Sequence, residues 1–303
     1  MSLLVVGSVA LDSVETPFGK RDDALGGSAT FFSTAASLFA PVQLVAVVGE
    51  DFPAEHVEFL RARNIDLAGL TRAPGKTFRW KGSYTYELNE AHTLDTQLNV
   101  FASFAPELPA AYQKARWLFL GNIDPVLQGR VLDQVQKPQL VAADTMNFWI
   151  GGKKADLLRT LERVDLLFVN DAEARELAGE SNIVKAARAI QHMGPKRVCI
   201  KRGEYGAMLF DHDHVCAAPA LPLAEVFDPT GAGDSFAGGF MGHVAAAGNL
   251  EPTTLRQALA VGTVVASFTV EQFSLDRLRT VTREQVRARF DEFRKLIHID
   301  ELA

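Results

Sequence analysis

The chain has 303 residues, of which 48% are hydrophobic and 22% charged, and it carries a formal net charge of −6. This acidic balance argues against a nucleic-acid-binding protein, which usually carries a basic surplus, but it permits a small anionic substrate held at a local positive site. No run of about 18 apolar residues occurs, and the start lacks a basic segment followed by a long apolar stretch, so neither a membrane span nor a signal peptide is expected.

Short, almost wholly apolar runs alternate with helix-like stretches along the chain. The first run, 3–6, and the next, 44–48, each end at a glycine, with a predicted helix over 28–39 between them. Pro53 begins another helix, where its missing N–H costs nothing. Further buried strands are expected at 117–120, 140–143, 166–169 and 198–200. The pattern predicts an α/β protein with three αβα layers and a mostly parallel sheet covered by helices on both faces.

One region departs from this pattern. Residues 76–100 alternate polar with aromatic or β-branched side chains and have no helical period, which is typical of half-exposed antiparallel strands. With 11–21 they predict a small β-sheet lid, while 1–10, 22–75 and 101–303 form the core. Near the end, 282–297 predicts an amphipathic helix with Val286, Phe290, Phe293 and Ile297 on one face.

The string Asp228-Pro-Thr-Gly-Ala-Gly-Asp234-Ser-Phe-Ala-Gly-Gly239 carries the strongest chemical signal. Pro229 and Gly231 mark a loop, and small and apolar residues from Gly233 to about Ala247 predict a helix. A glycine-rich turn that leads into a helix presents unpaired N–H groups and the positive end of the helix dipole, which together bind phosphate.

Asp234 lies in the first turn of that predicted helix. Its carboxylate either complements the helix dipole, worth about 0.3–1 kcal/mol, or acts as a base beside the anion site. In the second case it takes the proton from an acceptor hydroxyl as a phosphoryl group arrives.

The string resembles the C-terminal signature of the PfkB, or ribokinase-like, family of carbohydrate and nucleoside kinases. Further elements follow in the family's order over nearly the whole chain, and these are 7–12 with the glycine pair 26–27, 48–51, 170–173 and 203–206. The resemblance implies that Asp234 is the catalytic base and that the amides of Gly231, Ala232 and Gly233 form the anion hole. It also implies that the lid closes over the substrate and excludes water.

The resemblance further implies a substrate site and a nucleotide site. ATP and Mg²⁺ are the expected cosubstrate and metal, with Glu173 near Mg²⁺ through water, and Asp228 is a candidate for holding a monovalent cation such as K⁺. The expected substrate-binding residues are Asp12, Gly26, Gly27, Phe31 and Asn122, and the expected ATP-binding residues are Asn170, Lys201, Gly203, Gly206, Thr230, Gly231 and Gly233.

Two of these signals have simpler explanations. Asn170 and Glu173 also have the spacing of a helix-capping box, and one residue can both cap a helix and face the nucleotide. The run Asp211-His-Asp-His214 contains metal-ligand types, but apolar segments flank it and a hairpin turn explains it better. Cys199 and Cys216 lack a metal-like spacing and fit a reducing cytoplasm.

The chain departs from the family pattern at two positions. Phe31 stands where many sugar kinases have an asparagine that contacts a sugar hydroxyl, and Lys201 stands where threonine is common. Asp144 follows a predicted strand and is expected to face the cleft, with no contact assigned. Six aromatic residues offer either stacking surface for a flat group or core packing, and these are Phe31, Phe32, Phe78, Trp80, Phe148 and Trp149.

The expected activity is ATP-dependent phosphorylation of a hydroxyl on a sugar or sugar-like molecule. A ribonucleoside kinase of the same fold and a catalytically silent nucleotide-binding regulator are the alternatives. The intact Asp234 and glycine loop argue against the regulator. Expected partners are small molecules and a second copy of the chain paired through the lid.

Overall fold

The computed structural model describes residues 2–300. Its centre is a nine-stranded sheet in the order β13-β12-β11-β10-β9-β8-β1-β4-β5. Every neighbouring pair from β11 to β5 is parallel, whereas the pairs β13–β12 and β12–β11 are antiparallel. The strands are β1 (Leu3–Val6), β4 (Val42–Gly49), β5 (Ile65–Ala73), β8 (Trp117–Leu120), β9 (Leu140–Asp144), β10 (Leu166–Asn170), β11 (Arg197–Lys201), β12 (Ala207–Asp211) and β13 (His214–Ala218).

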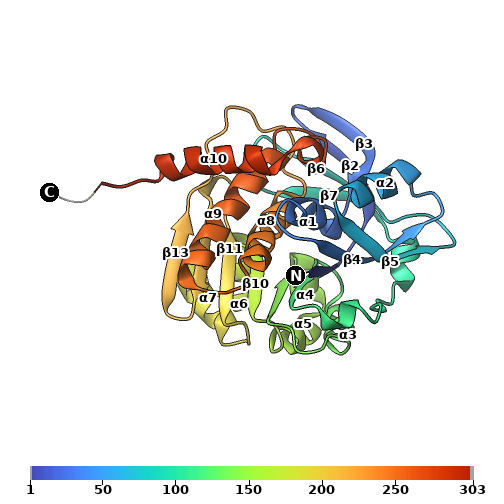
Figure 1. The fold of residues 1–303 in the computed structure, drawn as a ribbon, viewed down its shortest axis with the longest axis horizontal. Helices are drawn as coiled ribbons and strands as arrows, with labels where there is room; N and C mark the ends of the chain where they lie inside the picture. The colour runs from blue at the N-terminus through green and yellow to red at the C-terminus, as the bar shows by residue number, and fades with distance from the viewer. Residues whose placement is uncertain (1, 301–303) are drawn as a thin grey trace.

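Helices cover both faces of this sheet, as Figure 1 shows. Because successive strand residues point to opposite faces, Leu3 and Val5 belong to one buried cluster while Leu4 and Val6 belong to the other. The first cluster includes side chains of α1 (Ser28–Ala36), α2 (Ala54–Ala62), α8 (Ala232–Ala247), α9 (Pro252–Thr269) and α10 (Arg283–Leu296). The second includes side chains of α3 (Pro125–Leu132), α4 (Asn147–Gly152), α5 (Lys154–Leu161), α6 (Asp171–Ala178) and α7 (Ile183–Gln191).

A second, four-stranded sheet stands beside the core in the order β3-β2-β6-β7. Its strands are β2 (Ala10–Thr16), β3 (Gly19–Gly26), β6 (Arg79–Tyr84) and β7 (Ala91–Gln97). The β2–β3 and β6–β7 pairs are antiparallel, whereas β2 and β6 run parallel. All seven residues of β7 are exposed, whereas the polar alternation predicted a half-exposed strand.

The mostly parallel α/β sheet expected from the sequence is therefore confirmed. The helix expected at 28–39 ends its regular part at Ala36, and the C-terminal helix buries Val286 and Phe293 while Ile297 is 39% exposed. The sequence analysis did not identify β5 or α9. Within residues 2–300, none of the helices combines the length and apolar character that crossing a membrane requires.

The core gives a direct test of packing. Phe119 of β8 stacks on Phe32 of α1 with ring centroids 3.9 Å apart, and both side chains are fully buried. We expect Phe119→Ala to lower the free energy of unfolding by about 3–5 kcal/mol, measured by urea denaturation, because it leaves a cavity. Phe148→Ala is the control, because Phe148 is 65% exposed. A loss below about 1 kcal/mol in Phe119→Ala would contradict this packing.

Candidate active site

The loop before α8 brings backbone to the mouth of the site. Gly231 is the N-cap of α8 with φ 73°, a left-handed conformation that favours glycine. A Cβ at Gly231 would lie 2.3 Å from the ring of Phe31, so only a glycine fits between the loop and α1. The Ala232 N–H donates to Pro229 O at 3.1 Å, which tightens the turn. Of the three amides expected to form the anion hole, that of Ala232 is therefore engaged within the turn, and those of Gly231 and Gly233 lie at the start of the helix, where an anion binds.

Asp234 lies in the first turn of α8 and is half-buried. Burial and the neighbouring Asp144 raise the pKa of Asp234 to about 7, against the lowering effect of Lys201. A carboxyl group with a pKa near neutrality can hold or release a proton at physiological pH, which is the property of a general base.

Lys201 supplies positive charge at the same place. Its Nζ donates to Asp144 Oδ2 at 2.8 Å, and a Cβ at Gly233 would lie 3.0 Å from that Nζ. Burial acts to lower the pKa of Lys201, but Asp144 and Glu173 outweigh it and the pKa is raised, so the ammonium stays charged. Asp144 and Lys201 end the strands β9 and β11, whose carboxyl ends meet at one edge of the parallel sheet.

Glu173 and Asn170 form the capping box of α6. The Glu173 N–H donates to Asn170 Oδ1 at 2.8 Å, and the Asn170 N–H donates to Glu173 Oε2 at 2.7 Å. Burial and Asp144 raise the pKa of Glu173 to about 7, while Lys201 lowers it. Glu173 is thus both a helix cap and a member of the charge cluster formed by Asp144, Glu173, Lys201 and Asp234.

Asp12 occupies the opposite side of the site, on β2. Its Oδ2 accepts from the Gly27 N–H at 3.1 Å, and a Cβ at Gly26 would lie 1.9 Å from the same oxygen. Gly27, with φ 92°, begins α1. Burial raises the pKa of Asp12 to about 7; the Gly27 N–H opposes this, and Asp228 and Asp234 add to it. The glycine pair therefore makes room for a buried carboxyl group whose pKa is affected by Asp234.

Asp228 holds the loop before α8 in place through hydrogen bonds from the backbone. Its Oδ1 accepts from the Thr230 N–H and its Oδ2 from the Ser274 N–H, both at 2.8 Å. The Ser274 hydroxyl in turn donates to Leu25 O at 2.6 Å, next to the glycine pair. Both Asp228 oxygens are thus engaged by backbone, and the cation expected there has no support from this geometry beyond the buried carboxylate itself.

Asn122 and its aromatic neighbours lie at the carboxyl end of β8 and β9. The Trp149 Nε1–H donates to Asn122 Oδ1 at 2.9 Å, and Phe148 contacts the edge of Trp149 with centroids 4.8 Å apart. Because its oxygen is occupied, Asn122 keeps its amide N–H groups for other acceptors. Phe31 and Phe32 are different, because both belong to the buried core.

The glycines of the expected nucleotide loop lie after β11. A Cβ at Gly203, with φ 52°, would lie 2.1 Å from Asn89 Oδ1, and one at Gly206 would lie 2.1 Å from Ala218 O. The turn between β6 and β7, which carries Asn89, therefore packs directly on this loop.

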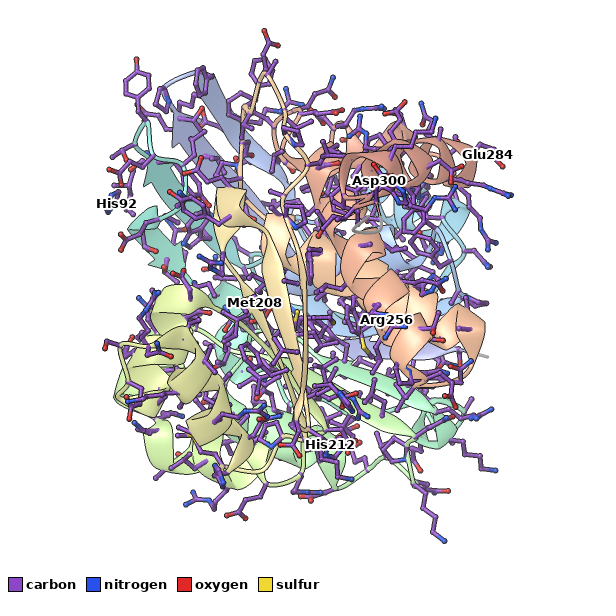
Figure 2. The ribbon with its side chains drawn as sticks, turned by 90° about the vertical axis from the view of Figure 1, so that its left-hand side faces the viewer. His92, Met208, His212, Arg256, Glu284 and Asp300 are labelled. Atoms are coloured by element: carbon purple, nitrogen blue, oxygen red, sulfur yellow. The ribbon has the colours of Figure 1, made fainter. Side chains whose placement is uncertain are left out.

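The histidines lie elsewhere. Figure 2 places His212 at the turn that joins β12 and β13, as a hairpin requires, and His92 at the outer side of the small sheet. Among residues 2–300, no group of three or more His, Cys, Asp or Glu side chains is arranged to hold a metal ion. Mg²⁺ that arrives with phosphate oxygens and keeps several waters does not require such a group.

Sequence reasoning missed two members of this site and left a third without a role. Asp144 was expected to face the cleft, and its partner turns out to be Lys201. Tyr84, whose hydroxyl accepts from the Thr230 hydroxyl at 3.3 Å, and Asn89, which packs on Gly203, come from the small sheet, and the sequence analysis gave them no role. No motif marks either residue, because their place depends on how the sheet folds over the core.

Comparison with known proteins assigns the class. Residues 14–279 match the pfkB family carbohydrate kinases. The chain belongs to this family, and it is a phosphotransferase that acts on a hydroxyl acceptor in sugars or nucleosides.

The similar proteins are kinases of nucleosides and sugars. A cytidine kinase of Thermococcus kodakarensis is 33% identical over 251 residues, 80% of this chain and 87% of that protein. A nucleoside kinase of Methanothermobacter thermautotrophicus is 27% identical, and the match covers 89% of this chain and 89% of that protein. The structure of the Burkholderia thailandensis nucleoside kinase in complex with inosine has a TM-score of 0.78 and 19% identity, with 96% of this chain and 97% of that chain covered.

The raised pKa of Asp234 predicts a pH-dependent stability. Its folded-state pKa is about 7 and its ordinary value is 3.8, so between these pH values the folded state binds more protons than the unfolded state. Stability therefore falls as pH rises through this window. We expect Asp234→Asn to remove part of this loss, so that at pH 8 the variant is more stable than the wild type by about 1–3 kcal/mol.

Urea denaturation at pH 5 and pH 8 measures this difference. Asp213→Asn is the matched control, because the Asp213 side chain is fully exposed. Equal pH dependence in the Asp234→Asn variant and the wild type would contradict the buried environment of Asp234.

Proposed function

We propose that this protein is an ATP-dependent nucleoside kinase in which Asp234 takes the proton from a ribose hydroxyl. The observation that carries the proposal is the position of Asp234 in the first turn of α8, beside the backbone of residues 231–233, which we call the anion cradle. Burial and Asp144 raise the pKa of Asp234 to about 7. The 33% identity to a cytidine kinase, over most of both chains, supports a nucleoside as the acceptor.

The acceptor side of the site would use Asp12 and Asp234. Asp12 lies against the glycine pair, and the charge of Asp234 adds to the raised pKa of Asp12, which supports placing the acceptor between the two carboxyl groups. A ribose bound between them can donate two hydrogen bonds. The reacting hydroxyl donates to Asp234, and a neighbouring hydroxyl donates to Asp12. As the new O–P bond forms, the proton passes to Asp234 and the bond from the γ-phosphorus to the ADP oxygen breaks.

The donor side would use the cradle at 231–233 and Lys201. The helix start offers N–H groups to the γ-phosphate, and the Lys201 ammonium lies at its mouth, beside Gly233. Mg²⁺, when bound with ATP, neutralises phosphate charge, and Glu173 is the residue that would reach its waters. Gly203 and Gly206 shape the loop after β11, which would contact the rest of the nucleotide.

The aromatic pair Phe148 and Trp149 favours a flat group on the acceptor. Phe148 is 65% exposed and Trp149 is half-buried. Of the other four aromatic candidates, Phe31 and Phe32 are core residues, Phe78 stacks on Phe101, and Trp80 donates to Thr93 within the small sheet. Asn122 stands beside Trp149 with free amide donors, which suit the carbonyl oxygen and ring nitrogen of a nucleobase.

The function is tested by following ADP and phosphorylated product over a panel of nucleosides and sugars with ATP and Mg²⁺. We expect turnover of at least one nucleoside, and we expect Asp234→Asn to lower kcat by at least about 10²-fold while the variant still folds.

Asp213→Asn again serves as the control and should keep full activity, because Asp213 is exposed in the β12–β13 turn. Turnover of sugars alone would refute the nucleoside assignment. Near-normal turnover in Asp234→Asn would refute the role of the base.

Lys201 gives an independent test of the charge cluster. Because its charge lowers the pKa of Asp234, we expect Lys201→Met to move the acidic limb of kcat/KM to higher pH and to raise KM for ATP by about tenfold or more. Asp144→Asn should move the limb to lower pH, because Asp144 raises that pKa. Lys201→Arg keeps the charge and is the control. Identical limbs in Lys201→Met and Lys201→Arg would exclude this electrostatic role.

A further inference from the structure

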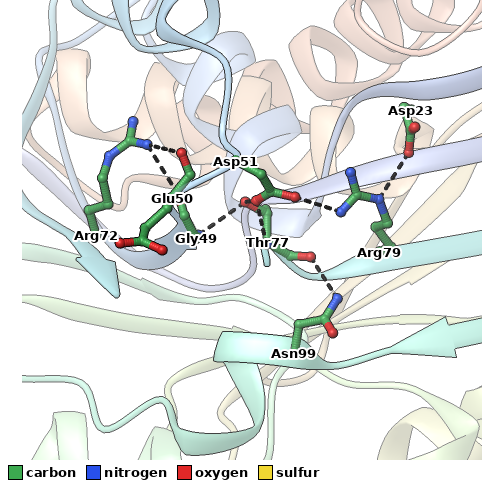
Figure 3. A network of polar contacts seen from close by, with 8 residues as sticks. All are labelled: Asp23, Gly49, Glu50, Asp51, Arg72, Thr77, Arg79 and Asn99. Carbon is green, nitrogen blue, oxygen red and sulfur yellow. Dashed lines mark hydrogen bonds and ion pairs between the residues drawn. The ribbon is translucent and has the colours of Figure 1, made fainter. Parts of the chain in front are cut away.

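The small sheet is fastened to the core at one end. Figure 3 shows Asp51, just after β4, accepting hydrogen bonds from the Thr77 N–H and hydroxyl, both at 2.7 Å, and from Arg79 at 2.8 Å. Arg79 also donates to Asp23 of β3 at 3.1 Å, and the Asn99 amide donates to Thr77 O at 2.9 Å. This network sets the start of β6 and the chain beyond β7 in a defined position on the core.

The other end of β6 reaches the anion cradle. Its last residue is Tyr84, and the hydroxyl of Thr230 donates to the Tyr84 hydroxyl at 3.3 Å across 146 residues of sequence. Thr230 directly precedes Gly231, the N-cap of α8. A second contact also joins the small sheet to the chain just before this loop, because the Thr16 hydroxyl of β2 donates to Phe227 O at 2.9 Å. The small sheet thus holds the loop that shapes the cradle.

Tyr84 lies on the same face of the small sheet as Asp12, because Asp12 pairs with Trp80 across β2 and β6 and Tyr84 is four residues further along β6. Burial raises the pKa of its hydroxyl; the Thr230 hydrogen bond opposes this, and the charges of Asp228, Asp12 and Asp234 add to it. The hydroxyl therefore stays protonated. Because a tyrosine hydroxyl can accept from Thr230 and still donate its own proton, Tyr84 has one donor left for a group in the space shared by Asp12 and Asp234.

We propose that Tyr84 is an acceptor-binding residue carried by the small sheet, donating its hydroxyl proton to a substrate oxygen while accepting from Thr230. This inference rests on the proposed kinase function and adds a residue to it. A substrate oxygen held by Tyr84 fixes the end of β6, and the same hydroxyl fixes the loop at Thr230. Correct placement of the acceptor and correct shape of the cradle are then linked through one atom.

The linkage has a functional consequence. A phosphoryl donor in the cradle is safe from water only while the small sheet lies over the acceptor. With the Tyr84 hydroxyl removed, the acceptor loses one hydrogen bond, and the loop before α8 loses its hydrogen bond from Thr230 to the small sheet. Water then competes with the acceptor, so less phosphorylated product forms for each ADP released.

The test compares Tyr84→Phe with Tyr86→Phe. Both changes remove one hydroxyl from the same hairpin, but Tyr86 is 82% exposed. For Tyr84→Phe we expect kcat/KM for the acceptor to fall about tenfold or more, with KM for ATP within about twofold of the wild type. We also expect the ratio of phosphorylated product to ADP to fall below that of the wild type. Tyr86→Phe should match the wild type in all three quantities.

A double-mutant cycle with Thr230→Val checks the contact itself. The effects of Tyr84→Phe and Thr230→Val on the product-to-ADP ratio should be less than additive, because each removes the same hydrogen bond. Additive effects, or a Tyr84→Phe enzyme that behaves like Tyr86→Phe, would overturn the inference. An equal loss for ATP and acceptor together with a lowered Tm would also overturn it, because this indicates a merely structural role.

The result remains separable from the proposed function. All variants are measured on whichever acceptor the wild type turns over. A wild-type enzyme that phosphorylates only a sugar refutes the nucleoside assignment, but the comparison of Tyr84→Phe with Tyr86→Phe still decides the role of Tyr84.

Discussion

The ion pair between Lys201 and Asp144, at 2.8 Å, is the interaction on which the site depends. Three carboxyl groups, those of Asp144, Glu173 and Asp234, gather at the carboxyl edge of the sheet, and burial of so much like charge is unfavourable. The Lys201 ammonium among them pairs with Asp144 and lowers the pKa of Glu173 and Asp234 against the raising effect of burial. The same ammonium lies beside Gly233, where phosphate charge would arrive.

Glycines solve a second problem, which is access. Gly231 and Gly233 leave room for Phe31 and for the Lys201 ammonium, and Gly26 leaves room for the Asp12 carboxyl. In each case a Cβ would lie 3.0 Å or less from the neighbouring group. The reactive side chains and the backbone cradle can therefore approach one another more closely than ordinary packing would permit. Phe31 takes part in this packing as a core residue with 1% exposure.

The small sheet adds control to this arrangement. Its root is fixed by Asp51, whose pKa is held down at about 2 by hydrogen bonds from Arg79 and Thr77 although burial acts to raise it. Its far end contacts the loop before α8 through Tyr84, and the following turn packs Asn89 against Gly203. One hairpin thus contacts both the loop expected to bind the γ-phosphate and the loop expected to bind the rest of the nucleotide.

The sequence by itself determined the layered α/β core and drew attention to Asp234. Apolar runs such as 166–169 are typical of strands that helices cover on both faces, whichever strands lie beside them. The glycine string before α8 has a local conformation that its own residues favour. Only the tertiary structure decided which charges meet. Asp144 and Lys201 are 57 residues apart, and Tyr84 and Thr230 are 146 apart. Such partners depend on strand order and on how the small sheet lies over the core, and neither leaves a periodic pattern in the chain.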